Sequence, residues 1–130
     1  MMHRTCLLIA TALGEGGIGL LLLVWPPVPL ALLLGVEQAS PEGLVTARVA
    51  GAALVALAVA CWLGRHDQDR PAQQGLLLGV LIYDLAVTGI LAHAGWFWSL
   101  TGIALWPAVL LHGALAGWCV VCLTGSRQQP

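Results

Sequence analysis

Charged residues are scarce in this sequence, and their scarcity excludes several classes of protein. Only 8% of its 130 residues are Asp, Glu, Lys or Arg, whereas about 25% is usual in a soluble domain. A chain so poor in charge, with 59% hydrophobic residues, cannot present a water-soluble globular surface, so we expect a lipid bilayer to surround it. The formal net charge of −1 also gives no basis for nucleic acid as a partner.

Catalytic and cofactor motifs are missing as well. The sequence contains no CxxCH or HExxH motif, no phosphate-binding loop and no serine-nucleophile motif. Four membrane crossings need about 20 apolar residues each, which leaves no length for a soluble catalytic domain. We therefore expect residues 1–130 to form one integral membrane domain without enzyme activity and without a cofactor.

What the sequence does contain is four long apolar runs, which predict an all-α, four-helix transmembrane bundle. The predicted spans are residues 6–25, 44–63, 75–93 and 100–123. A cleaved signal peptide is the alternative for the first run, but the run is too long and contains Glu15. Residues 28–36 are apolar but only about half as long as a span, so we expect them to lie in the membrane interface or to fold back over the bundle. Ser40 and Pro41 predict the start of the second spanning helix, with Ser40 as its cap.

Basic residues in short loops predict the orientation. Four arginines fall on the same side of the predicted bundle: Arg4, Arg65, Arg70 and Arg127. The other side carries Arg48, Glu37 and Glu42. Since loops rich in arginine stay in the cytoplasm, we expect both termini to be cytoplasmic and the protein to lie in a bacterial inner membrane. Tryptophan favours the membrane interface, and the expected anchors are Trp25, Trp96 and Trp98 on the outer side and Trp62 and Trp118 on the inner side.

Ionisable residues inside the apolar runs are the candidate functional residues. Each costs about 2.5–3.5 kcal/mol at the centre of an inserted helix, so we expect it to face protein or water and to have a partner. The residues expected to form a buried polar network are Glu15, Arg48, Tyr83, Asp84, Thr88 and His112. The network either fixes the helix register or acts as a proton or ion relay or a polar ligand site.

Helical spacing and chain order predict how this network pairs. Arg48 continues into a stripe of small residues at every fourth position, namely Ala52, Ala56 and Ala60, and small residues let helices approach closely. We therefore expect Arg48 to face inward. Since consecutive antiparallel helices usually pack together, we expect Arg48 to bond Glu15 and Asp84 to pair with His112.

Cysteine and histidine suggest two further, weaker sites. All four cysteines lie near the predicted cytoplasmic side: Cys6, Cys61, Cys119 and Cys122. A soft metal site is conceivable because Cys119 and Cys122 are neighbours on one helix, but apolar surroundings favour inert packing and a reducing cytosol disfavours a disulfide. His93 and His112 suggest haem, yet they lie too far apart to bind one iron. Pro107 predicts a bend in the fourth helix, just outside His112.

Four short motifs also occur in the second, third and fourth spans. They are Arg-x-x-Gly at the start of the second span, Ala-Cys-Trp at its end, Tyr-Asp in the third span and Trp-Pro-x-x-x-x-His in the fourth. Their residues are Arg48, Gly51, Cys61, Trp62, Tyr83, Asp84, Trp106, Pro107 and His112. These motifs resemble those of a group of small, uncharacterised bacterial four-helix integral membrane proteins, and the resemblance covers most of the chain. It implies the four-span layout, which is also similar to DoxX-type proteins as architecture, but it implies no activity.

Three functions follow as expectations. The first is an accessory or structural subunit that packs on a larger membrane complex or on itself, because the helices carry faces of small residues and no catalytic motif. The alternative is a small oligomeric transporter or channel for protons or soft metal ions that uses Glu15, Arg48, Asp84 and His112. A haem-linked or redox membrane protein is the second alternative.

Overall fold

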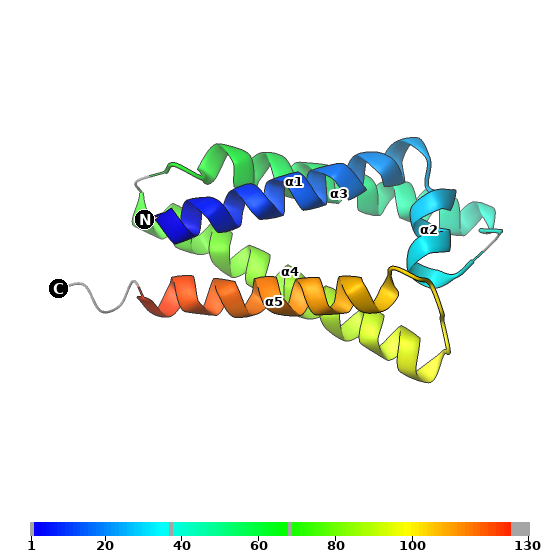
Figure 1. Cartoon of the computed structure of the whole chain (residues 1–130). Helices are drawn as coiled ribbons and strands as arrows, with labels where there is room; N and C mark the ends of the chain where they lie inside the picture. Colours follow the sequence, from blue (N-terminus) through cyan, green and yellow to red (C-terminus); the bar gives the residue numbers. More distant parts are fainter. Residues whose placement is uncertain (1, 37, 68, 126–130) are drawn as a thin grey trace.

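The computed structural model describes residues 2–36, 38–67 and 69–125, which form helices and connecting segments without any strand. The helices are α1 (Met2–Val24), α2 (Pro27–Leu34), α3 (Pro41–Gly64), α4 (Arg70–Phe97) and α5 (Leu105–Thr124) (Figure 1). Four of them are long and apolar enough to cross a membrane: α1, α3, α4 and α5. The predicted all-helical fold with four candidate spans is therefore confirmed, and the chain has the makeup of a multi-pass membrane protein. Glu37 and Arg127, used above to predict orientation, lie outside the described residues, as does the side chain of Arg70.

Helix starts follow the capping chemistry of the sequence. Ser40 has an extended backbone, and its hydroxyl accepts a hydrogen bond from the backbone N–H of Gly43 at 3.2 Å. Pro41 then occupies the first turn of α3, where its missing N–H costs nothing. The predicted cap is thus confirmed. Pro71 plays the same part in α4, so this helix starts at Arg70 and runs on to Phe97, longer at both ends than the predicted span.

The start of the fourth span differs from the prediction. Residues 100–104 are not α-helical, and α5 begins at Leu105. Pro107 therefore lies in the first turn of α5, where a backbone N–H would have no partner within the helix in any case. The predicted bend at Pro107 is wrong for this reason: no helix precedes the proline, so there is none to kink.

The four long helices form two antiparallel hairpins, in which α1 packs on α3 and α4 packs on α5 (Figure 1). The first hairpin is tightest where Gly19 faces Gly51. A Cβ atom added to Gly51 would lie 2.7 Å from the carbonyl oxygen of Gly19, and one added to Gly19 would lie 2.9 Å from that of Gly51. Only glycine allows two helix backbones to come this close.

The inward face of α3 is not the one predicted. Its buried residues are Ala47, Gly51, Ala58 and Cys61. The stripe from Arg48 through Ala52 and Ala56 to Ala60 is exposed. Small residues occur at helical spacing on both faces of α3, so spacing alone does not select one of them. The Gly19–Gly51 contact determines which face points inward. This close approach requires a residue without a Cβ atom, and opposite Gly19 that residue is Gly51.

Helix α2 lies across one end of the bundle, which we call the α2 end (Figure 1). The backbone N–H of Ala104 donates to the carbonyl oxygen of Leu32 at 2.8 Å. Gly102 is buried against the backbone of Leu33, where there is no room for a side chain. These contacts fold the segment back over the bundle, one of the two predicted placements. Trp25, Trp96 and Trp98 are exposed at this end.

The opposite end, where α1 begins and α5 ends, is held by polar side chains. The guanidinium of Arg4 donates to Gln73 Oε1 at 3.2 Å and to the carbonyl oxygen of Cys122 at 3.1 Å. The hydroxyl of Thr5 donates to the carbonyl oxygen of Arg65 at 3.1 Å. The start of α1 is thereby bonded to residues of the other hairpin and to the end of α3.

The apolar core lies near this same end and draws on all four long helices. It consists of Leu7, Leu8, Ala12, Cys61, Leu77, Val80, Cys119 and Cys122. Trp118 packs half-buried against this core, whereas Trp62 is exposed, with the Arg65 guanidinium 3.9 Å from its ring centroid. Three of the four cysteines are thus packing residues, and Cys6 is exposed. They behave as small hydrophobes, as buried cysteines usually do.

Candidate polar site between the helices

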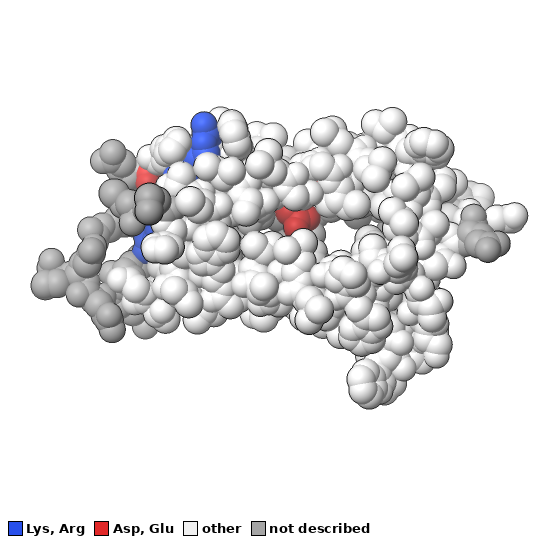
Figure 2. Space-filling model, in the orientation of Figure 1, with Lys and Arg blue, Asp and Glu red and all other residues white. Residues whose placement is uncertain are grey.

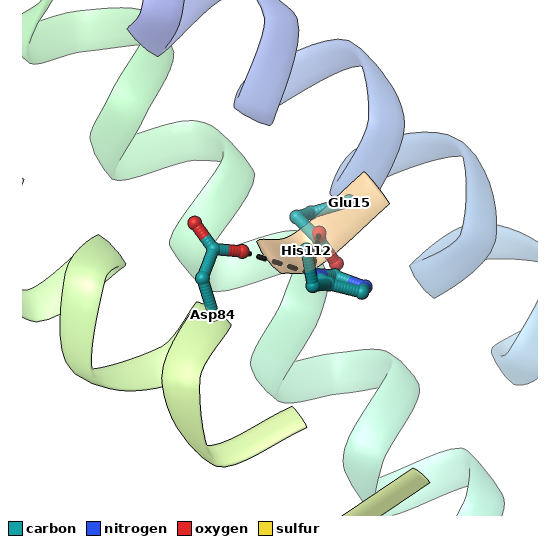
Figure 3. Close-up of side chains that lie close together, drawn as sticks. All are labelled: Glu15, Asp84 and His112. Carbon is teal, nitrogen blue, oxygen red and sulfur yellow. Dashed lines mark hydrogen bonds and ion pairs between the residues drawn. The ribbon is translucent and has the colours of Figure 1, made fainter. Parts of the chain in front are cut away.

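Three ionisable side chains from three different helices meet near the middle of the bundle (Figure 3). Glu15 comes from α1, Asp84 from α4 and His112 from α5. The Nδ1 atom of His112 lies 2.8 Å from Asp84 Oδ1 and 3.8 Å from Glu15 Oε1. We call these three residues the polar cluster. Two carboxylates therefore lie near one nitrogen of a single imidazole ring.

Tyr83 completes the surroundings of the cluster. Its hydroxyl donates to Glu15 Oε2 at 2.8 Å, and its ring meets the His112 ring edge-on, with centroids 5.7 Å apart and planes at 80°. A single side chain thus orients one carboxylate and also restricts the imidazole. Because Tyr83 and Asp84 are consecutive on α4, the position of this helix places both at once.

The cluster is almost entirely removed from the surface. Asp84 is fully buried, Glu15 is 4% exposed, and the side chain of His112 is 12% exposed. In the view of Figure 2, acidic atoms appear midway along the bundle, with surface free of Lys, Arg, Asp and Glu between them and the charged residues at the end. A charged group held at this depth in a membrane costs free energy and is rarely present without a role.

Chain order explains part of this convergence. α4 and α5 are consecutive and antiparallel, so Asp84 and His112 face one another, and the predicted pairing of these two residues is confirmed. The bond from Tyr83 to Glu15 joins α4 to α1, which are not consecutive. Chain order does not predict a contact between non-consecutive helices, so this bond was not among the predicted pairs.

Arg48 is not part of the cluster. It is exposed on α3, and Glu15 bonds Tyr83, so the predicted bond between Arg48 and Glu15 is wrong. The outward position allows the long side chain of Arg48 to extend along the helix toward the membrane interface and avoid the cost of burying its charge. The two carboxylates are therefore not compensated by this arginine.

Several buried oxygen atoms near the cluster have no hydrogen-bond partner within the described part of the chain. They are Thr11 Oγ1, Asp84 Oδ2 and Thr88 Oγ1. Thr11 lies one helical turn before Glu15 on α1, and Thr88 lies one turn after Asp84 on α4, so each shares a helix face with a carboxylate. Thr88, expected in the network, thus lies beside the cluster without bonding it. Buried oxygen atoms are normally bonded, so these three are available to a water molecule or a ligand.

The other predicted candidates are not brought to this site. His93 packs against Phe97 and Trp98, with ring centroids 4.7 and 5.3 Å away. It follows Asp84 by nine residues on α4, about 13 Å along the axis at 1.5 Å per residue, so it does not join His112. Among the described residues, the group of three His, Cys, Asp or Glu side chains with ligand atoms within 4.8 Å of one another is Glu15, Asp84 and His112. The cysteines are not in it.

Comparison with models of protein families found no match, and searches of curated proteins and of solved structures found none either.

Proposed function

We propose that the protein carries a cation, either a proton or a metal ion, across a bacterial inner membrane by way of the polar cluster. The observation that supports this most is the meeting of Glu15, Asp84 and His112 inside a bundle of apolar helices. Ionisable residues at this depth commonly mark the pathway of an ion or proton. Two carboxylates with one imidazole attract positive charge and can also exchange protons.

Four helices enclose little space, so the transporting unit is an oligomer in this proposal. Arg48 has no part in the pathway, because it is exposed on α3. The unpartnered hydroxyls of Thr11 and Thr88 extend the polar region by one helical turn on each side of the cluster. They offer binding points for water on the way to and from the carboxylates.

Flux into proteoliposomes tests the proposal. Vesicles with wild-type protein should show proton or divalent-metal uptake driven by a gradient, and Asp84→Asn should abolish it, because the change removes the charge of a fully buried carboxylate. Thr46→Val is the matched control, since its exposed hydroxyl bonds only the backbone carbonyl of Glu42 within its own helix. Uptake equal to that of empty vesicles, with folded wild-type protein, would rule the function out.

A second candidate is an accessory or structural subunit, which the exposed stripe on α3 favours. Arg48, Ala52, Ala56 and Ala60 lie on one outward face, and small residues at this spacing allow another helix to approach closely. We expect Ala56→Leu to reduce co-purification of a partner or of a second copy in mild detergent, while Val59→Leu should leave it unchanged. A lone monomer in mild detergent would count against this candidate.

The orientation with both termini in the cytoplasm also remains our proposal, supported by the position of Arg4 and Arg65 at the same end of the bundle. In a Cys6→Ser background, an impermeant maleimide should label Gln38→Cys from outside the cell and Asp67→Cys only after permeabilisation. Both positions are exposed. The reverse labelling pattern would show the opposite orientation.

A further inference from the structure

We propose that the polar cluster binds one divalent transition-metal ion of the zinc class, through Glu15 Oε1, Asp84 Oδ1 and His112 Nδ1. This inference rests on the proposed function, because it names the cation that the cluster would handle. Four observations support it: the spacing of the ligand atoms, the balance of charge, the unpartnered oxygen of Asp84 and the position of Tyr83.

The spacing fits a small coordinated ion. With bonds of about 2.0–2.2 Å, ligand atoms around a tetrahedral metal lie about 3.4 Å apart. His112 Nδ1 is 2.8 Å from Asp84 Oδ1 and 3.8 Å from Glu15 Oε1, values on either side of that separation. All three atoms lie within 4.8 Å of one another. An ion between them requires the His112 and Asp84 atoms to separate by about half an ångström and the Glu15 carboxylate to move closer.

The two carboxylates of the cluster match the charge of a divalent ion. With the carboxylates ionised and the imidazole neutral, Glu15 and Asp84 contribute two negative charges in a buried position. Among the described residues, no arginine bonds either carboxylate: Arg4 and Arg65 bond partners at the end of the bundle, and Arg48 is exposed. Each carboxylate can accept a proton of its own, or the two together can bind one divalent ion, which cancels both charges and removes the penalty of burying them.

The remaining atoms supply independent support. Asp84 is fully buried, yet its Oδ2 atom, which points away from His112 in Figure 3, has no partner in the described chain, so a cation bound at Oδ1 would also stabilise a carboxylate that the protein satisfies at one oxygen only. Tyr83 bonds Glu15 Oε2 and leaves Oε1, the atom nearer to His112, available for a metal. A residue that orients a metal-binding carboxylate in this way is typical of the outer shell of a metal site. In Figure 3 the far nitrogen of the imidazole points away from both carboxylates, which leaves Nδ1 as the ligand.

The donor atoms select the class of metal. Calcium takes six to eight oxygen ligands, more than this cluster offers, and soft ions such as Cu(I) prefer sulfur. The cysteine sulfurs lie outside the cluster, and three of them belong to the apolar core. Two carboxylate oxygens and one imidazole nitrogen suit zinc, cobalt and similar divalent ions. Binding through His112 Nδ1 requires the neutral tautomer that carries its proton on Nε2, so a proton on Nδ1 moves to the far nitrogen by exchange with solvent.

Equilibrium binding of Co²⁺ and Zn²⁺ to the full chain in mild detergent tests the site without reference to transport. After treatment with a chelator, the wild type should bind one ion per chain, and bound Co²⁺ should give the visible absorption of an oxygen and nitrogen site without thiolate charge-transfer bands. Glu15→Gln and His112→Ala should lose the spectrum. Tyr83→Phe should weaken affinity by about tenfold or more, as loss of an outer-shell partner does. Circular dichroism checks that each variant is folded.

The control variants are Cys119→Ala with Cys122→Ala, which change the core but leave the cluster intact and should bind normally. Lack of stoichiometric binding by folded wild-type protein would overturn the proposal, as would binding that depends on the cysteines or survives Glu15→Gln. Metal binding without any flux would support this site and contradict the transport function. Proton flux without metal binding would support transport and overturn the metal site.

Discussion

The close approach of Gly19 and Gly51 makes a quantitative prediction about the stability of the bundle. A Cβ atom at Gly19 would meet Gly51 O and Leu54 Cβ at 2.9 Å and the backbone N of Val55 at 3.0 Å. Ordinary contact begins at 3.4 Å, and backbone atoms cannot rotate away. Gly19→Ala must therefore push α1 and α3 apart by several tenths of an ångström.

The expected cost follows from two opposing effects. Inserting a methyl group into a well-packed contact costs about 1–3 kcal/mol. Alanine in place of glycine inside a helix gains up to about 1 kcal/mol. Because three contacts are violated and two of them involve backbone atoms, we expect the steric term to prevail, with a net loss of about 1–2 kcal/mol in the free energy of unfolding.

A neighbouring glycine provides the matched control. Gly17 is exposed on the same helix, and a Cβ atom there would meet nothing within 4 Å. Gly17→Ala should therefore be neutral or slightly stabilising, and the difference between the two variants cancels the helix-propensity term. Unfolding by SDS in mixed micelles, followed by circular dichroism, measures this difference. Gly51→Ala should resemble Gly19→Ala, and the double variant should lose less than the sum, since the first change already separates the helices.

The reasoning would be refuted if Gly19→Ala were as stable as Gly17→Ala. That result would mean that the helices separate without loss of other packing, and that the two glycines do not set the distance between α1 and α3.

Three other predictions follow from the same structure. Arg48→Ala should change the free energy of unfolding in mixed micelles by no more than about 0.5 kcal/mol, because Arg48 is exposed; a loss of about 3–5 kcal/mol would instead indicate a broken buried ion pair. Tyr83→Phe should cost about 1–3 kcal/mol in the same assay, since it leaves a buried oxygen of Glu15 without its donor, and no measurable loss would contradict that bond. In folded protein, a maleimide should modify Cys6 quickly and the three buried cysteines only after unfolding, as mass spectrometry can show; rapid modification of a second thiol would contradict the packing of the core.

The sequence predicted the spans because their signal is strong and local. A long apolar run has few alternatives to a membrane helix, and Ser40 with Pro41 marked the start of α3 through chemistry that involves only near neighbours. The start of α5 was misplaced because residues 100–104 are apolar without being helical. Apolar composition signals burial in lipid or protein, and it does not by itself specify the backbone conformation.

The polar site was predictable as a set of residues, and only in part as a set of contacts. The cost of burying an ionisable group identified Glu15, Asp84 and His112, and the antiparallel order of α4 and α5 identified one pair. The prediction that Arg48 faces inward and bonds Glu15 was wrong, because it assumed the wrong rotation of α3 about its own axis. That rotation depends on which face fits against α1, which a count of small residues on each face does not reveal.

The pairing of helices into two hairpins has a consequence for how the chain is made. The first hairpin, α1 with α3, can pack as soon as it enters the membrane, because most of its contacts join these two helices. Asp84 enters later with α4, and its hydrogen-bond partner, His112, belongs to α5, the last of the described helices. During synthesis, the Asp84 carboxyl group therefore lies in the bilayer without its partner until α5 is inserted. A chain that lacks α5 therefore leaves Asp84 without this partner.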